Sequence, residues 1–79
     1  QNASGNAVVG LIVRGTIASH NVFGIYIRPG GVGSGNSAFS NGYAGISTTC
    51  PAVLVGNTST GNGTNYAITG VCATADNAQ

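Results

Sequence analysis

The sequence predicts an all-β chain wound as a parallel β-solenoid, a fold in which each repeat forms one coil that stacks on the next. Two observations support this prediction. Gly-Asn or Gly-Thr pairs recur at spacings of 20 and then 21 residues, beginning at Gly15, Gly35 and Gly56. Short apolar runs that alternate with the strand period lie between these pairs. Strands this short at a fixed spacing fit stacked coils better than a β-sandwich.

Four segments of the chain share a pattern in which Asn precedes a small residue and then an aliphatic one. They read "NAVVGLIVRG", "NVFGIYIRPG", "NGYAGISTTC" and "NGTNYAITGVC". This repeat predicts a single domain over residues 1–79 with about three to four coils of roughly 20 residues. The expected coils are approximately 5–14, 15–34, 35–55 and 56–72, with a tail at 73–79.

Alternation within the runs places one set of aliphatic side chains in the core. The expected core columns hold Leu11, Ile25, Ile46 and Ile68, with Val13 and Ile27 beside them. Phe23 and Tyr66 share one slot of the repeat and are also expected in the core. The stretch "PGGVGS" that follows Arg28 has no counterpart after Arg14. It predicts an outward loop, which would either shape a binding face or be a tolerated surface insertion.

Gly-Asn pairs on a fixed spacing are expected at the corners of the coils. Both residue types tolerate the left-handed backbone that a sharp corner requires. Equivalent residues of successive coils lie about 4.8 Å apart, so stacked Asn side chains can hydrogen-bond along the axis. We expect one ladder of Asn21, Asn41 and Asn62, with Asn6 below it. We expect a second ladder of Asn36 and Asn57, with Thr16 at its end.

The composition argues against several classes of partner. Arg14, Arg28 and Asp76 are the only formally charged side chains, and the net charge is +1. Nucleic-acid binding needs clustered Lys and Arg, and a membrane span needs about 20 apolar residues. We therefore expect no nucleic acid and no membrane insertion. A nearly uncharged surface instead favours association with copies of the same chain, in an extracellular or cell-surface setting.

Cys50 and Cys72 each lie four residues after the aliphatic residue of their coil. In one slot of adjacent coils their Cα atoms would be about 5 Å apart, which is within the range of a disulfide. We expect this disulfide; the alternative is two buried free thiols that pack as small apolar residues. Two Cys and one His provide too few ligands for zinc, so no metal or cofactor is expected.

Arg14 and Arg28 are expected to share an outward column on neighbouring coils. Two cations without a nearby acid could hold a sulfate, phosphate or uronate group, and Tyr26 on the same face could contact a sugar. Solvated side chains, or a contact with the next subunit, are the favoured interpretation. His20 has no acid or Ser partner and is expected at the surface or at a corner. Asn57 and Asn62 match the glycosylation pattern but are interpreted as ladder residues.

The repeated motif "GN-T-x-x-x-N-x-x-x-GI", over about residues 5–72, resembles the right-handed parallel β-helix repeat of the pectate-lyase-like superfamily. The resemblance implies a right-handed winding. The motif says little about function, because the family contains polysaccharide lyases and hydrolases, phage tailspikes, adhesins and structural proteins. Its lyases need an acid cluster for calcium, and glycoside hydrolysis needs two carboxylates. Asp76 is the only acid of this chain, so we expect a non-catalytic member or fragment.

The leading functional hypothesis is a structural extracellular subunit that stacks end to end into a fibre or surface layer. The sequence contains no amphipathic helix that could cap the solenoid and no charged residues that would block its end strands. Uncovered strand edges can pair with the strands of another chain. The alternative is a carbohydrate-binding segment of a larger β-helical adhesin, tailspike or polysaccharide-active protein. An ice-binding solenoid is less favoured, because "TST" occurs once, at Thr58–Thr60, and does not recur in register.

Overall fold

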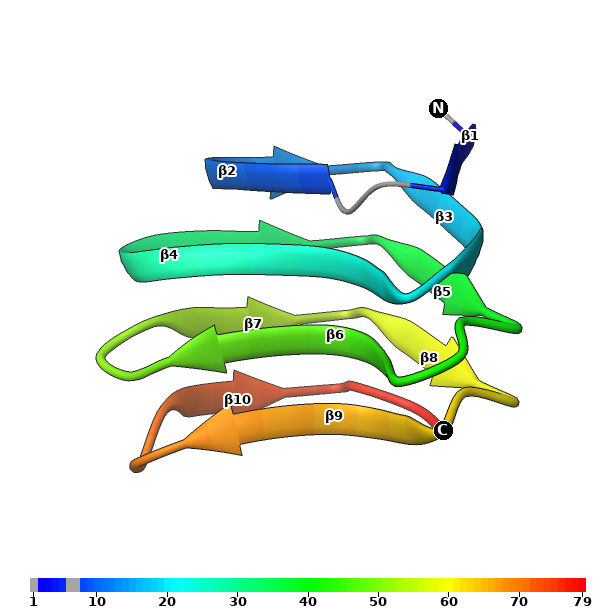
Figure 1. Cartoon of the computed structure of the whole chain (residues 1–79). Coiled ribbons are helices and arrows are strands. Elements are labelled where there is room, and N and C mark those ends of the chain that lie inside the picture. Colours follow the sequence, from blue (N-terminus) through cyan, green and yellow to red (C-terminus); the bar gives the residue numbers. More distant parts are fainter. Residues whose placement is uncertain (1, 6–7) are drawn as a thin grey trace.

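The computed structural model describes residues 2–5 and 8–79 as a parallel β-solenoid of about three turns, with no helix in these ranges (Figure 1). This confirms the predicted all-β fold. The strands are β1 (Asn2–Gly5), β2 (Val8–Arg14), β3 (Ile17–Asn21), β4 (Phe23–Ser34), β5 (Ser37–Phe39), β6 (Ala44–Thr49), β7 (Val53–Val55), β8 (Thr58–Thr60), β9 (Thr64–Thr69) and β10 (Ala73–Ala75).

The strands form three faces. A four-stranded sheet in the order β1-β3-β5-β8 makes the narrow face, at the right of Figure 1. The second sheet bends so that each coil supplies it with two segments. The first half of β4 pairs with β6 and forms the front face, together with the start of β2 and β9. The second half of β4 pairs with β7 and forms the rear face, together with the end of β2 and β10.

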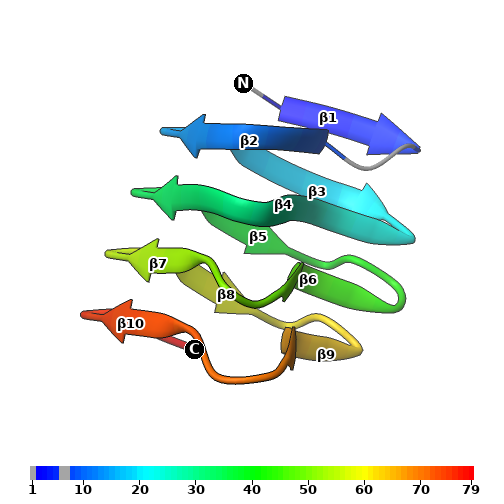
Figure 2. The same cartoon turned by 90° about the vertical axis from the view of Figure 1, so that its left-hand side faces the viewer.

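The winding is right-handed. In Figure 1, β6 runs leftward along the front, β7 returns rightward behind it, and each coil lies below the previous one. Figure 2 separates the two faces, with β6 and β9 on one side and β7 and β10 on the other. All pairings between these strands are parallel, as stacking of successive coils requires.

Columns of inward side chains form a thin core. One column contains Val8, Ile25, Ile46 and Tyr66, and the next contains Gly10, Ile27, Thr48 and Ile68. The rear column contains Val13, Gly33, Leu54 and Thr74. Small residues line the narrow face, where Ala18, Ala38 and Ser59 stack in register. The fully buried side chains of the central coils, such as Ile25, Ile46 and Leu54, are the strongest apolar contribution to stability.

The structure corrects the predicted core alignment. Leu11 is 54% exposed and does not stack on Ile25; Val8 takes that place. Ile68 is 36% exposed and stacks on Thr48, so Tyr66, not Ile68, continues the Ile25 and Ile46 column. Val13 and Ile27 are buried as predicted. Phe23 is 41% exposed and does not share a slot with Tyr66, because it pairs with Ala44.

The cause of the misalignment is a short first coil. Only Leu11 separates the front and rear segments of β2, whereas residues 28–31 separate those of β4. Later coils have corners of the same length as β4, since Thr48 and Val53 are again five positions apart. The predicted outward loop "PGGVGS" is therefore wrong. Its first residues form an ordinary corner, and Val32–Ser34 belong to the rear sheet.

The predicted end of the repeat at Cys72 is also wrong. β10 (Ala73–Ala75) pairs with β7, and Ala78 bridges to Thr58 on the narrow face. The residues assigned to a tail at 73–79 therefore complete the last coil. Asn77 continues one of the ladders described next.

Candidate functional site: the ladders and the last coil

In the part of the chain that the structure describes, two types of corner have a left-handed residue immediately before a ladder position. At the first corner these residues are Gly15, Gly35, Gly56 and Asp76, with φ between 55° and 64°. At the second corner His20, Ser40 and Gly61 have φ between 56° and 66°. Gly adopts this region without steric cost, whereas His20, Ser40 and Asp76 hold it with a side chain. The predicted corner chemistry is present, and His20 is an exposed corner residue.

The first ladder runs from Thr16 through Asn36 and Asn57 to Asn77. The Oδ1 of Asn57 accepts from the backbone N–H of Asn36 at 3.1 Å and from its Nδ2 at 2.9 Å. Asn77 repeats both bonds toward Asn57, at 3.0 and 2.8 Å. Thr16 contributes its backbone N–H, which donates to Asn36 at 2.9 Å. Asn77 is absent from the predicted ladder because Asp76 replaces the expected Gly. Its spacing of 20 residues from Asn57 is the signal that could have revealed it.

The second ladder runs from Asn21 through Asn41 to Asn62. The Oδ1 of Asn41 accepts from the Asn21 backbone N–H at 3.1 Å, and the Oδ1 of Asn62 accepts from Asn41 at 2.9 Å. Asn65, also missed, lies three residues after Asn62 and accepts from its backbone N–H at 3.1 Å. The expected Asn6 lies outside the described residues. The glycines after two rungs are also bonded to the preceding coil: Gly42 N–H donates to Asn21 O, and Gly63 N–H donates to Asn41 O.

Both ladders are directional. Apart from Asn21 and Asn65, the Oδ1 of every ladder asparagine described above accepts from the coil before it, and its Nδ2 also donates to a backbone carbonyl one coil back. Asn36 donates to Val13 O, Asn57 to Gly33 O and Asn77 to Leu54 O, at 2.8 to 3.0 Å. A rung of this kind therefore presents its N–H donors to the following coil and its Oδ1 acceptor to the preceding coil. A further coil would extend the ladder only in the same chain direction.

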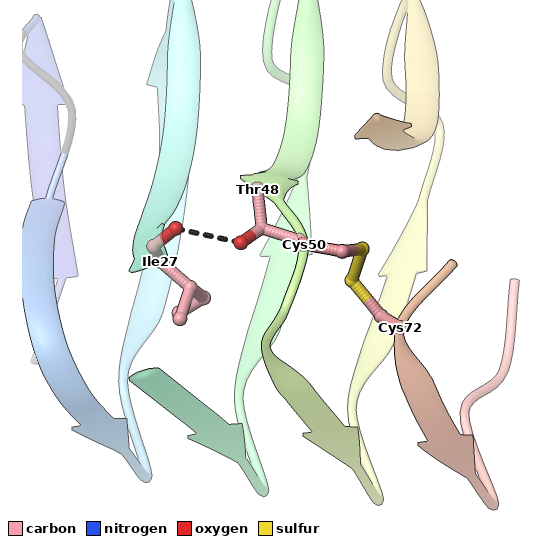
Figure 3. Close-up of a disulfide and its surroundings, with 4 residues drawn as sticks. All are labelled: Ile27, Thr48, Cys50 and Cys72. Carbon is pink, nitrogen blue, oxygen red and sulfur yellow. Dashed lines mark hydrogen bonds between the residues drawn. A yellow bond between two sulfur atoms is a disulfide. The ribbon is translucent and has the colours of Figure 1, made fainter. Parts of the chain in front are cut away.

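The Cys50–Cys72 disulfide joins the last two coils at the corner between the front and rear faces (Figure 3). The Cα atoms are 5.2 Å apart, and the described residues contain no free cysteine. The bond is as predicted, but the two residues are not in one slot. Thr49 pairs with Thr69 and Val53 with Ala73, so the bridge crosses the register diagonally. Beside it, Thr48 donates its hydroxyl to Ile27 O at 2.7 Å in the core.

The underside of the last coil is open. A depression of about 240 Å³ is lined by Leu54, Tyr66, Ile68, Thr74, Asn77 and Gln79. β9 and β10 each pair with a strand on one side only. The Tyr66 hydroxyl donates to Ala78 O at 2.6 Å, and burial raises the pKa of Tyr66 above its ordinary value. This end combines apolar surface, strand edges and outward-facing ladder donors.

The arginines do not form the expected pair. Arg14 pairs in register with Ser34 on the rear face, whereas Arg28 follows Ile27 at the front. The shared column was inferred from the misaligned first coil, so this premise of the anion site is wrong. Both side chains are exposed. A binding role for either arginine stays a prediction.

Tyr26 lines a shallow apolar depression of about 350 Å³ on the front face, together with Val9, Phe23 and Ser47. Val9, Tyr26 and Ser47 stack in register there. The Phe23 ring packs against Tyr43 with centroids 4.9 Å apart. Three aromatic rings therefore lie on the front face, although only Tyr26 was predicted as a contact residue.

Other candidate residues have structural roles. Asn57 is 1% exposed, and the Asn62 side-chain nitrogen is bonded to Ala38 O, so both serve the ladders. Among residues 2–5 and 8–79, no three His, Cys, Asp or Glu side chains gather where they could hold a metal ion. The same part of the chain contains no helix that is long and apolar enough to cross a membrane. The disulfide is compatible with an extracellular protein.

No protein-family model matches the chain, and no match is found among the curated proteins or the solved structures. The resemblance to the pectate-lyase-like superfamily is therefore not supported by a relative. The chain is a parallel β-solenoid on the basis of its strand pairing.

Proposed function

We propose that this chain is a non-enzymatic, structural β-solenoid subunit that associates end to end with copies of itself into an extracellular fibre or surface layer. The observation that carries the proposal is the open underside of the last coil. Its depression of about 240 Å³ exposes the apolar columns that elsewhere continue from coil to coil. An uncovered coil of this kind is a template for another coil.

Three features of the last coil favour another solenoid coil as its cover. β9 and β10 offer unpaired backbone groups on one side. Asn77 is the last rung of its ladder, in which Asn36 and Asn57 each donate their backbone N–H to the rung that follows. Tyr66 and Ile68 end two core columns and remain partly exposed. Parallel strand pairing, a continued amide ladder and apolar contact would all be satisfied together.

The extracellular and non-enzymatic parts of the proposal are supported by chemistry. A disulfide is typical of oxidising compartments. Asp76 is the only carboxylic side chain, and it lies at a corner of the last coil, whereas His20 lies at the other type of corner two coils earlier. An acid–base pair from these residues would need contact that their places in the coil do not provide.

Electron microscopy and fibre diffraction of the native, disulfide-bonded protein test the proposal. We expect filaments with an axial spacing of about 4.8 Å and a subunit repeat of roughly 19 Å, because each copy adds four levels to the front and rear faces. Discrete monomers at high concentration would contradict it. A larger parent chain, found by mass spectrometry of the native source, would instead favour a segment of a longer β-helix.

The aromatic depression on the front face favours a second candidate function, carbohydrate binding. Phe23 and Tyr26 offer ring surface, and Ser47 offers a hydroxyl, in a volume of about 350 Å³. Calorimetry against neutral and acidic oligosaccharides would test it, with Tyr26→Ala expected to abolish binding and Ile12→Ala on the rear face as control.

An ice-binding array is less favoured, because Thr58 and Thr60 pair with Ser37 and Phe39. Freezing-point hysteresis would test that array directly.

A further inference from the structure

The narrow face has one more level than the other two faces. Asn2, Ile17, Ser37, Thr58 and Ala78 follow one another in a single column, because each pairs in register with the next. The front and rear faces have only four levels, which end at β9 and β10. A second copy that stacked below the last coil would therefore bring its own Asn2 to the place that Ala78 occupies.

We infer that the last coil accepts the first coil of a second copy in the same orientation, and that the strap formed by Ala78 and Gln79 must leave before β1 of that copy can enter. This inference rests on the proposed end-to-end association and specifies its register and its regulation. The occupant is a second copy because the contact continues the coil-to-coil pairing already present three times on the front face.

The strap is held by few contacts. Ala78 N–H donates to Asn57 O at 2.8 Å, Ser59 N–H donates to Ala78 O at 2.9 Å, and Tyr66 donates to the same oxygen at 2.6 Å. Gln79 accepts from Asn65 at 3.4 Å. In contrast, β1 (Asn2–Gly5) pairs with β3 at three positions within its own copy. An incoming β1 would replace a single bridge with a full strand, so exchange favours the stacked copy.

Charge complementarity supports the same register. Arg14, Ser34 and Val55 stack on the rear face, and Ala75 ends that column. Arg14 of a second copy would lie below Ala75, beside the Asp76 corner. Asp76 is the only anion of the chain and is exposed in the last coil, and Arg14 is exposed in the first. The stack would bring these two side chains to the same corner of each junction, where opposite charges at an exposed site attract each other modestly.

The core columns also fit in this register. Tyr66 would meet Val8 of the second copy, Thr74 would meet Val13, and Ile68 would meet Gly10. Gly10 carries no side chain, and the Val13 side chain lies where its Cβ would be, so Ile68 would pack against Val13 and the Gly10 backbone. This contact would bury apolar surface that the last coil leaves partly exposed.

The first experiment compares the assembly of the 79-residue chain with that of a chain ending at Asn77, by light scattering and sedimentation. The incoming β1 would replace the backbone bonds of the strap, so the net cost of displacing the strap is about that of the single Tyr66 bond. Because one net hydrogen bond is worth up to about tenfold in an equilibrium constant, we expect a critical concentration roughly tenfold lower without the strap. Tyr66→Phe removes one strap bond, retains the ring and should shift assembly in the same direction. Tyr26→Phe on the outer front face is the matched control and should change nothing. Equal assembly of the full and shortened chains would overturn the strap.

The second experiment tests the register. Asp76→Asn and Arg14→Gln should each raise the critical concentration by about two- to fivefold at low salt, as expected for an exposed ion pair. The double variant should be no worse than either single variant, and Arg28→Gln should have no effect. Strictly additive losses, or an equal loss from Arg28→Gln, would overturn the pairing. If the full chain forms filaments but neither the strap variants nor the charge variants change its critical concentration, this inference is rejected and the proposed function stands. If no variant forms filaments, both are rejected.

Discussion

The narrow face and the corner between the front and rear faces hold neighbouring coils together in different ways. At the narrow face, both flanking corners carry an amide ladder that links successive coils. At the front–rear corner, no amide ladder is present among the described residues, and one disulfide joins the last two coils. The first arrangement distributes stability over many rungs, and the second concentrates it at one place. A repeated rung also specifies how a further coil would add, which a single covalent bridge does not.

Removing a central rung of a ladder should cause the largest loss of stability. Asn57 is 1% exposed, and its side chain takes part in four hydrogen bonds that link three coils. Asn57→Ala should lower the free energy of unfolding by about 4 kcal/mol, at roughly 1 kcal/mol for each net bond. Urea denaturation measures this loss. Thr58→Ala next to it, on an exposed side chain, should change stability by less than about 0.5 kcal/mol. A loss from Asn57→Ala as small as that of its neighbour would show that the ladder is not a main source of stability.

Removal of the disulfide should have the next largest effect. Cys50 and Cys72 are separated by 22 positions, and closing a loop of this size should stabilise the fold by about 3 kcal/mol. We expect the Cys50→Ala, Cys72→Ala double variant to unfold at lower urea while hydrogen exchange in the first two coils stays protected. Equal loss of protection in all coils would mean that the bridge acts on the whole solenoid rather than on its end.

Two corner substitutions should have smaller effects of opposite sign. Gly35 has φ 61°, and a Cβ there would meet no atom within 4 Å, so Gly35→Ala should cost only the backbone penalty of about 1–2 kcal/mol. Ser40 has φ 56° with a side chain already present, so Ser40→Gly should stabilise by roughly 0.5–1 kcal/mol. Thermal unfolding of both variants provides the check. A stabilising Gly35→Ala would show that the corner does not require a left-handed residue.

The smallest expected effect is a loss of stability at alkaline pH. Burial raises the pKa of Tyr66 in the folded protein above its value in the unfolded chain. The folded state therefore keeps the Tyr66 proton to a higher pH than the unfolded chain does. The contribution of this group to the free energy of unfolding is fully present below the pKa of the unfolded chain, and it is lost as the pH rises through the pKa of the folded protein. Urea midpoints above about pH 10 should fall, and Tyr66→Phe should remove part of that fall. An identical alkaline profile for the variant would indicate that other tyrosines cause it.

The sequence was sufficient for the features that recur. Asn36, Asn41, Asn57 and Asn62 were placed in two ladders because corner chemistry restricts which residues fit there. The predicted alignment of the first coil is wrong because a shortened corner at Leu11 leaves the local apolar pattern unchanged while shifting the register against β4. Asn77 was missed because Asp76 can adopt the left-handed corner that Gly adopts elsewhere. The uncapped end was predicted from the lack of a capping helix, but the depressions on the last coil and on the front face depend on three-dimensional exposure, which periodicity does not encode.

The backbone bonds of the rungs also bear on how the protein ages chemically. Asn41–Gly42 and Asn62–Gly63 are the type of dipeptide that deamidates readily, because the glycine nitrogen attacks the preceding side-chain carbonyl carbon and expels ammonia. Here that nitrogen is already committed, since Gly42 and Gly63 each donate to the coil before them, at 2.7 and 3.1 Å. We expect peptide mapping after prolonged incubation to find both asparagines intact in the folded protein and converted in the denatured one. The fold thereby lengthens the chemical lifetime of the residues that hold it together.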